Sequence, residues 1–225
     1  MGDAASMRGG PHQGQPVLSA GAPLNGARAA MVLVHGRGAD AHDILTLADD
    51  LAQGNFAYLA PQAAGNTWYP YSFLAPMSQN EPGLSSGLQA IADVLARIAA
   101  AGIPPERTIL AGFSQGACLT LEYVARHARR YGGIAGLSGG VIGPEDTPRD
   151  YPGSLGGTPV FLGCSDIDPH IPKARVEQTA EIFRRMGASV TMRLYARMGH
   201  TVNEDEIQAV RTMMRSLVAG NQASG

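Results

Sequence analysis

The sequence has few cysteines, no run of basic residues and no long apolar run. Its two cysteines among 225 residues favour small core thiols in a reduced compartment over a disulfide framework. A net charge of -2 without clustered Lys or Arg excludes the basic field that nucleic-acid binding requires. No apolar run approaches the roughly 20 residues that cross a bilayer, and residues 1–8 lack the apolar stretch of a secretory signal. We therefore expect a cytoplasmic protein with no nucleic-acid partner and no stable membrane insertion.

What the sequence does contain is a regular alternation of short apolar runs with helical spacing. Strands are expected near residues 31–34, 56–60, 108–111, 133–138, 160–162 and 190–195, with helices between them. This order predicts an α/β protein with a mainly parallel sheet and helices on both faces. Residues 1–15 have no periodicity and are expected to form a mobile tail, followed by a single domain over 16–225. Residues 16–30 are expected to form a marginal hairpin beside the sheet.

The most informative segment joins the expected strand at 108–111 to the following helix. It contains Gly112-Phe-Ser-Gln-Gly116, a G-x-S-x-G pattern at a strand-to-helix junction. Side chains beside the serine would block the close passage of strand and helix, and the two glycines relieve that clash. Ser114 would then be exposed over a helix N-terminus, where negative charge is favoured. We interpret Ser114 as a candidate nucleophile.

A serine hydroxyl needs a base, and a histidine base needs a group that holds its tautomer. His200 follows the last expected strand, and carboxylates near residue 166 precede it, which gives the order Ser…Asp…His of α/β-hydrolases. Asp166 stands at the natural exit of its strand and is our preferred third member. Asp168, before Pro169, stays an alternative because it could instead cap the next helix. A metal site of Asp166, Asp168 and His170 is disfavoured because no further ligand cluster supports it.

Acyl transfer also needs N–H donors for an oxyanion. We expect these from the backbone of Gln115, after the nucleophile, and of Arg37, in a loop where Gly36 and Gly38 let the backbone approach closely. The direction of the Arg37 side chain is left open. The long irregular segment at 62–85 is expected to be either a cover for the core or an acyl-binding wall. Its candidate substrate-binding residues are Trp68, Tyr69, Phe73 and Leu74.

Three blocks of the sequence resemble the phospholipase/carboxylesterase family, which includes the acyl-protein thioesterases. They are Val34-His-Gly-Arg-Gly-Ala-Asp40, Ala111-Gly-Phe-Ser-Gln-Gly-Ala117 and Met198-Gly-His200. The resemblance implies an α/β-hydrolase fold, a triad of Ser114, an aspartate and His200, and an oxyanion hole from Arg37 and Gln115. Two departures concern Arg37, where many members have Leu, and the segment 163–172, which looks two residues longer than the usual G-x-x-D-P-x-x-P.

These observations predict a cofactor-free serine carboxylesterase without a large lid domain, acting on small-molecule esters with small to medium acyl chains. We expect a monomer or weak homodimer. Within the same chemistry the alternative is an acyl-protein thioesterase or lysophospholipase, and outside it a non-catalytic binding protein on a hydrolase fold. A dienelactone-type hydrolase is disfavoured because such enzymes resemble this fold but carry a cysteine at the elbow.

Overall fold

The computed structural model of the protein describes residues 9–51 and 53–219. This part of the chain contains seven strands and six α-helices, and all six strands that the sequence predicts are present. The strands are β1 (Val17–Gly21), β2 (Ala29–Val34), β3 (Phe56–Pro61), β4 (Thr108–Phe113), β5 (Gly133–Leu137), β6 (Pro159–Ser165) and β7 (Ser189–Tyr195). The α-helices are α1 (Ala41–Leu45), α2 (Leu47–Leu51), α3 (Gly83–Ala100), α4 (Gln115–Arg126), α5 (Lys173–Arg185) and α6 (Glu204–Ala219).

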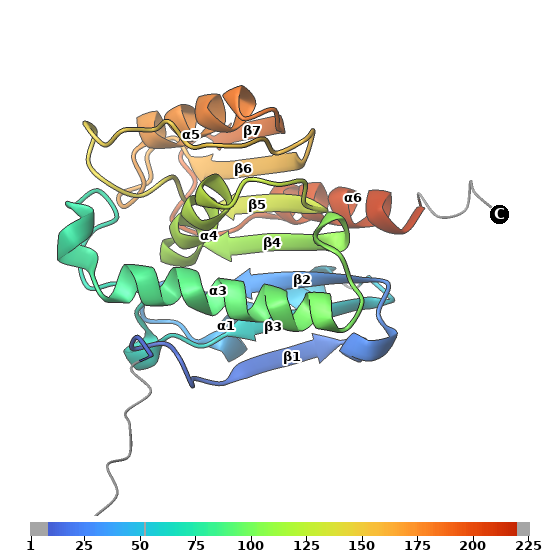
Figure 1. Ribbon diagram of the computed structural model, residues 1–225. Helices are drawn as coiled ribbons and strands as arrows, with labels where there is room; N and C mark the ends of the chain where they lie inside the picture. The colour runs from blue at the N-terminus through green and yellow to red at the C-terminus, as the bar shows by residue number, and fades with distance from the viewer. Residues whose placement is uncertain (1–8, 52, 220–225) are drawn as a thin grey trace, which may run out of the picture.

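The strands form one sheet in the order β1-β3-β2-β4-β5-β6-β7. All neighbouring pairs are parallel except β1 and β3, which are antiparallel at one edge. Helices α3, α4 and α5 cover one face, and α1, α2 and α6 cover the other (Figure 1). The predicted mainly parallel α/β sheet with helices on both faces is therefore confirmed.

Alternate residues of β2 show how the two core layers arise. Ala30, Val32 and Val34 belong to the hydrophobic cluster under α3, α4 and α5. Ala29, Met31 and Leu33 belong to the cluster under α1, α2 and α6. Successive side chains of a strand point to opposite faces, so a strand that is covered on both sides must be apolar throughout. The sequence run at 31–34 is continuous for this reason.

The segment before β2 does not form the expected hairpin. Strand β1 pairs with the outer edge of β3, with Val17 opposite Pro61. Strand β2 instead lies between β3 and β4 and bonds to both in parallel. The inner position gives the fully apolar β2 two neighbours, whereas the half-exposed β1 can tolerate an edge.

Residues 9–15 are not a tail, which corrects the expected boundary at residue 15. His12 is 4% exposed, its Nδ1 accepts from the N–H of Ala64 at 3.0 Å, and its Nε2 lies 2.7 Å from the carbonyl oxygen of Trp68. This pattern assigns the proton to Nε2 of a neutral ring. Burial lowers the pKa of His12, which keeps the ring uncharged. The remaining tail residues, 1–8, lie outside the described residues.

None of the described helices is long and apolar enough to span a membrane. The segments that cross the carboxyl end of the sheet are loops and short 3-10 turns, such as Ala64–Asn66 and Met77–Asn80. Within residues 9–51 and 53–219 no additional lid domain covers this edge, as the sequence predicts.

Candidate active site

The candidate site lies at the carboxyl edge of the sheet, where loops follow β2, β4, β6 and β7. Open α/β sheets bind ligands at this edge because the loops after parallel strands converge there. The loops carry Arg37, Ser114, Asp168 and His200 respectively. Residues that are separated by up to 163 positions in the chain thus meet because their strands are parallel neighbours or near neighbours.

Ser114 forms the turn between β4 and α4 in a conformation that non-glycine residues rarely adopt. Its φ is 54° and its ψ is -120°, and its N–H donates to the carbonyl of Leu137 at 2.9 Å. A Cβ on Gly112 would lie 2.5 Å from the carbonyl oxygen of Gly116, and a Cβ on Gly116 would overlap the carbonyl oxygen of Val34. The two glycines therefore let strand and helix pass closely enough to hold the strained serine, as a nucleophile elbow requires.

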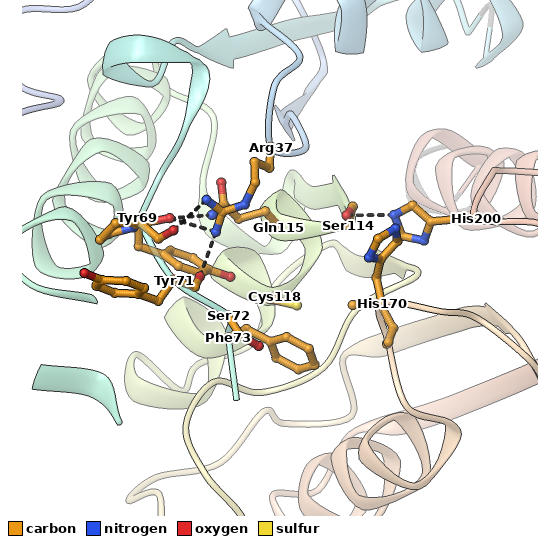
Figure 2. A pocket seen from close by; sticks show the side chains of 12 residues that line it. Arg37, Tyr69, Tyr71, Ser72, Phe73, Ser114, Gln115, Cys118, His170 and His200 are labelled. Carbon is orange, nitrogen blue, oxygen red and sulfur yellow. Dashed lines mark hydrogen bonds between the residues drawn. The ribbon is translucent and has the colours of Figure 1, made fainter. Parts of the chain in front are cut away.

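A chain of hydrogen bonds joins the serine to a histidine and a carboxylate. His200 Nε2 lies 2.8 Å from Ser114 Oγ, and His200 Nδ1 lies 2.7 Å from Asp168 Oδ2 (Figure 2 shows the first of these bonds). An ionised carboxylate only accepts, so Nδ1 carries the proton and Nε2 is left to accept the serine O–H. The ring also packs at 4.9 Å from Phe113. The tautomer and the orientation are those that a general base for Ser114 needs.

The structure corrects the expected partner of His200, which is Asp168 and not Asp166. The Asp166 side chain is exposed, and its Oδ1 accepts from the N–H of Arg197 at 2.8 Å. The side chain of Asp168 is 0% exposed and bonds His200. Its other oxygen, Oδ1, accepts from the N–H groups of His170 and Ile171 at 2.8 and 3.0 Å. Asp168 does not cap the next helix, whose N-cap residue is Pro172. Its Oδ1 instead stabilises the turn at His170 and Ile171, while its Oδ2 bonds His200.

The surroundings of Asp168 keep its carboxylate charged. Partial burial alone would raise its pKa. The hydrogen bond with His200 and the two backbone N–H donors outweigh burial and hold the pKa of Asp168 below its usual range. The carboxylate is therefore ionised at neutral pH and can stabilise an imidazolium at His200.

The backbone N–H groups of Gln115 and Arg37, the expected oxyanion donors, have no acceptor among the described residues. Gln115 is the first residue of α4, so its N–H has no acceptor within the helix. Arg37 lies in the loop after β2, and its N–H donates to no carbonyl within 9–51 and 53–219. The Gln115 side chain is occupied elsewhere, since it accepts from the N–H of Trp68 and donates to the carbonyl of Tyr69. Both backbone donors are therefore without another acceptor in the described part of the chain, and the oxyanion hole stays a prediction.

The side chain of Arg37, whose direction the sequence left open, holds the wall of the cavity. Its guanidinium donates to the carbonyl oxygens of Tyr69, Pro70 and Tyr71 at 2.9, 2.8 and 2.7 Å. These bonds tie the loop after β3 to the loop after β2 (Figure 2). Arg37 thus fixes the wall opposite the triad.

A cavity of about 410 Å³ opens beside Ser114, within the usual range for small-molecule sites. It is lined by Arg37, Tyr69, Pro70, Tyr71, Ser72, Phe73, Ser114, Gln115, Cys118, His170, Ile171 and His200. Figure 2 shows the aromatic side chains of Tyr69, Tyr71 and Phe73 across the cavity from His200.

The structure brings two of the four expected substrate-binding residues, Tyr69 and Phe73, to this cavity. The other two are corrected. Trp68 is 0% exposed and its Nε1 donates to the carbonyl of His35 at 2.9 Å, while Leu74 packs against the core. The irregular segment therefore serves as both core cover and cavity wall, two uses that composition could not separate.

Six lining residues are not among the predicted site residues: Pro70, Tyr71, Ser72, Cys118, His170 and Ile171. Tyr71 is 57% exposed, and an aromatic in a loop beside two others was a usable signal. His170 packs edge-on against His200 at 4.9 Å, a position that follows from Asp168 and not from any pattern of its own. Cys118 lies one helical turn after Ser114, and burial raises its thiol pKa to about 12, so it lines the cavity without being a reactive thiolate. Across the described ranges, no three His, Cys, Asp or Glu side chains are arranged to hold a metal ion.

Comparisons with known proteins identify the family of the chain. The model of the Phospholipase/Carboxylesterase family matches residues 19–218. The chain is similar to the crystal structure of a phospholipase/carboxylesterase from Dyadobacter fermentans, with 45% identity, a TM-score of 0.86, and coverage of 89% of this chain and 96% of that one. It is also similar to the structure of esterase PE8, with 25% identity, a TM-score of 0.72, and coverage of 90% and 98%.

Among curated relatives, the chain is 32% identical over 123 residues to acyl-protein thioesterase 1 of Gibberella zeae, covering 51% of this chain and 49% of that protein. It is 29% identical over 161 residues to a probable carboxylesterase of Oryza sativa subsp. japonica, covering 69% and 60%. The chain thus spans about half to three fifths of the length of these relatives. Because the family model covers nearly the whole sheet and all the site loops, the chain belongs to the phospholipase/carboxylesterase family.

Proposed function

We propose that the protein is a serine carboxylesterase that hydrolyses esters with small to medium acyl chains through an acyl-enzyme. The observation that carries the proposal is the continuous chain of hydrogen bonds from Asp168 through His200 to Ser114, at 2.7 and 2.8 Å. Membership of the phospholipase/carboxylesterase family supports it, because a complete triad in such a family member is the arrangement that acyl transfer needs.

In the proposed reaction, His200 Nε2 takes the proton of Ser114 as the hydroxyl attacks the ester carbonyl. The N–H groups of Gln115 and Arg37 stabilise the oxyanion that forms. Asp168 holds the imidazole in its tautomer and stabilises its positive charge. His200 then protonates the departing alcohol, and a water molecule that it activates releases the acid from the acyl-enzyme.

The size and lining of the cavity support the acyl-chain limit. About 410 Å³ beside Ser114 accommodates a short or medium chain against Tyr69 and Phe73. Thioesters are a second candidate class, because curated relatives at 32% identity are named acyl-protein thioesterases. Lysophospholipids are a further alternative within the same chemistry.

The test compares wild type with Ser114→Ala and a matched Ser85→Ala control, whose serine is exposed on α3 away from the cavity. We expect wild type and the control to bind a fluorophosphonate probe covalently and to hydrolyse p-nitrophenyl esters from acetate to octanoate. Ser114→Ala should lose labelling and about a millionfold in kcat. Turnover by wild type no better than by Ser114→Ala would leave the non-catalytic binding protein as the better interpretation.

A matched pair of octanoyl esters and octanoyl thioesters separates the first two candidates by their kcat/KM. We also propose a cytoplasmic location, which the free buried thiols of Cys118 and Cys164 support. That the protein is a monomer or weak homodimer stays a prediction, which sedimentation velocity would test.

A further inference from the structure

A second cavity, of about 360 Å³, adjoins the site on the other side of His200. It lies between the loop after β2, the helices α1 and α2, and the loop before α6. His200 is part of its lining. Nothing in the reaction described above uses it.

The reacting atoms separate the two cavities. His200 is the one residue that lines both. Ser114 lines the first cavity and its neighbour Phe113 the second, and Arg37 lines the first and its neighbour Gly36 the second. A Cβ on Gly36 would lie 3.4 Å from the Cβ of Ser114, so the backbone between the cavities passes directly beside the nucleophile. The backbone of Gly36 thus forms part of the boundary between the cavities, and His200 is the triad residue that lines both.

We propose that this second cavity receives the alcohol part of the ester, an inference that rests on the proposed esterase function. The first cavity is lined by Ser114 and by Gln115 and Arg37, whose N–H groups are the expected oxyanion donors. The acyl carbonyl, which must touch all three, extends into that cavity. The departing oxygen must instead take a proton from His200. Its substituent lies on the side of His200 away from the acyl group, which is the second cavity.

The lining defines the kind of alcohol. Ile44, Leu47, Phe113 and Val202 provide an apolar surface, and Phe113 stacks against His200 at 4.9 Å. Asp43 is the one residue with a carboxylate in the lining, which includes no Lys or Arg. A phosphate-bearing leaving group, such as a glycerophosphodiester or a coenzyme A thiol, would meet a carboxylate and no cation. The substrate class that fits is therefore an ester of a neutral, apolar alcohol.

The first test truncates the apolar surface and measures selectivity among alcohols with the acyl group fixed as butyrate. The measured quantity is the ratio of kcat/KM for benzyl butyrate to that for methyl butyrate. In Leu47→Ala we expect this ratio to fall roughly tenfold, because an apolar contact to the larger alcohol is lost. Leu45→Ala is the matched control, since Leu45 is also a partly buried leucine packed against the same core cluster but does not line the cavity.

A ratio in Leu47→Ala within twofold of that in the Leu45→Ala control would overturn the proposal. This outcome is distinct from failure of the esterase function itself. If Ser114→Ala hydrolysed both butyrates as well as wild type, no esterase reaction at this site would exist. If Ser114 is required and the alcohol ratio does not move, the esterase stands and only the subsite is wrong.

The second test introduces a positive charge at the rim of the second cavity. Thr46 is exposed at the rim of the cavity, and Thr46→Lys would place an ammonium beside the alcohol. We expect this variant to raise kcat/KM for 1-butyryl-glycerol 3-phosphate about tenfold relative to 1-butyryl-glycerol. Thr191→Lys, which makes the same charge change at an exposed threonine on β7, should leave that ratio as in wild type. Equal ratios in the two lysine variants would contradict the proposed position of the alcohol.

Discussion

Two turns at the carboxyl edge of the sheet carry the nucleophile Ser114 and the carboxylate of Asp168, and their conformations are fixed in different ways. The turn from β4 to α4 is fixed by backbone packing: the neighbours of Gly112 and Gly116 are peptide groups that cannot move aside. The loop from β6 to α5, which we call the acid loop because it carries Asp168, is fixed by side chains. In it the hydroxyl of Ser165 donates to Met198, and each oxygen of Asp168 has its own donors.

This difference explains why the turn at Ser114 could be predicted from the sequence and the orientation of Asp168 could not. A backbone constraint selects glycine at fixed positions, so the residues themselves mark the turn. A side-chain constraint depends on which way each residue faces. Asp166 and Asp168 are both carboxylates after the same strand, and no local pattern tells which of them turns toward His200.

The largest expected effect sharpens this contrast within the acid loop. Asp168→Asn should lower kcat about ten-thousandfold, because the amide can no longer hold the Nδ1–H tautomer of His200. Asp166→Asn is the matched control and should lower kcat less than about threefold. The carboxylate of Asp166 accepts from the backbone N–H of Arg197 and does not contact His200. Steady-state kinetics with p-nitrophenyl butyrate would check both variants, and equal losses would contradict the assignment of Asp168.

The next effect compares a glycine of the elbow with a glycine of β6. Gly116→Ala forces a Cβ against the carbonyl oxygens of Val34 and His35 and should destabilise the protein by about 3 kcal/mol or more. At Gly163 the obstacle is the carboxyl end of Glu206, a side chain whose Oε1 has no hydrogen-bond partner among the described residues. Gly163→Ala should therefore cost less, about 1–2 kcal/mol.

Urea denaturation followed by circular dichroism would give both free energies of unfolding. If Gly163→Ala proved the more destabilising of the two, the claim that backbone neighbours constrain Gly116 more tightly than a side chain constrains Gly163 would be wrong.

Much of the fold could be predicted because its signals are periodic and local. The apolar run of β2 and the helical spacing of α3 each report burial that the structure repeats. The predicted hairpin at 16–30 was wrong because pairing of β1 with β3 is non-local. The predicted tail was wrong at 9–15 because the burial of His12 depends on the N–H of Ala64 and the carbonyl of Trp68, 52 and 56 residues away.

In the candidate site, too, features marked by local sequence signals could be predicted and features set by non-local contacts could not. Ser114, His200 and the backbone donors were placed by strand ends and glycines, which the sequence displays. The cavity wall was only half predicted, since Trp68 and Tyr69 are adjacent aromatics yet only Tyr69 faces the cavity. Which of two neighbours turns inward is decided by partners such as the carbonyl of His35, which no spacing reveals.

A smaller effect concerns a second carboxyl near β6. Glu206 is 0% exposed, and burial raises its pKa from 4.5 to about 7, although the N–H of Asn203 opposes the shift. Between these values the folded protein holds a proton that the unfolded chain releases, so stability should fall as pH rises from about 5 to about 8. The loss should be at most about 3 kcal/mol.

Glu206→Gln should remove this contribution to the pH dependence, because the amide does not titrate. Glu204→Gln, an exposed position in the same first turn of α6, should keep the slope of wild type. Free energies of unfolding at pH 5 and pH 8 would check both variants, and identical slopes for wild type and Glu206→Gln would contradict the buried, protonated carboxyl.

The smallest effect tests the side-chain link between the acid loop and the histidine loop. Ser165 Oγ donates to the carbonyl of Met198 at 2.5 Å and accepts from the N–H of Ile167 at 3.2 Å. Ser165→Ala should cost about 1 kcal/mol of stability. It should also lower kcat a few-fold with little change in KM, because Ser165 positions the loops of Asp168 and His200 but does not line the cavity.

Ser154→Ala provides the control, because Ser154 Oγ makes the same pair of bonds, to the carbonyl of Met186 and from the N–H of Gly156. It lies away from the site, so its loss should affect stability alone. A similar fall of kcat in both serine variants would mean that stability and not loop position limits turnover. A fall confined to Ser165→Ala would mean that the Ser165 hydroxyl helps to hold the loop of Asp168 in its catalytic position, whereas the elbow is held by its backbone.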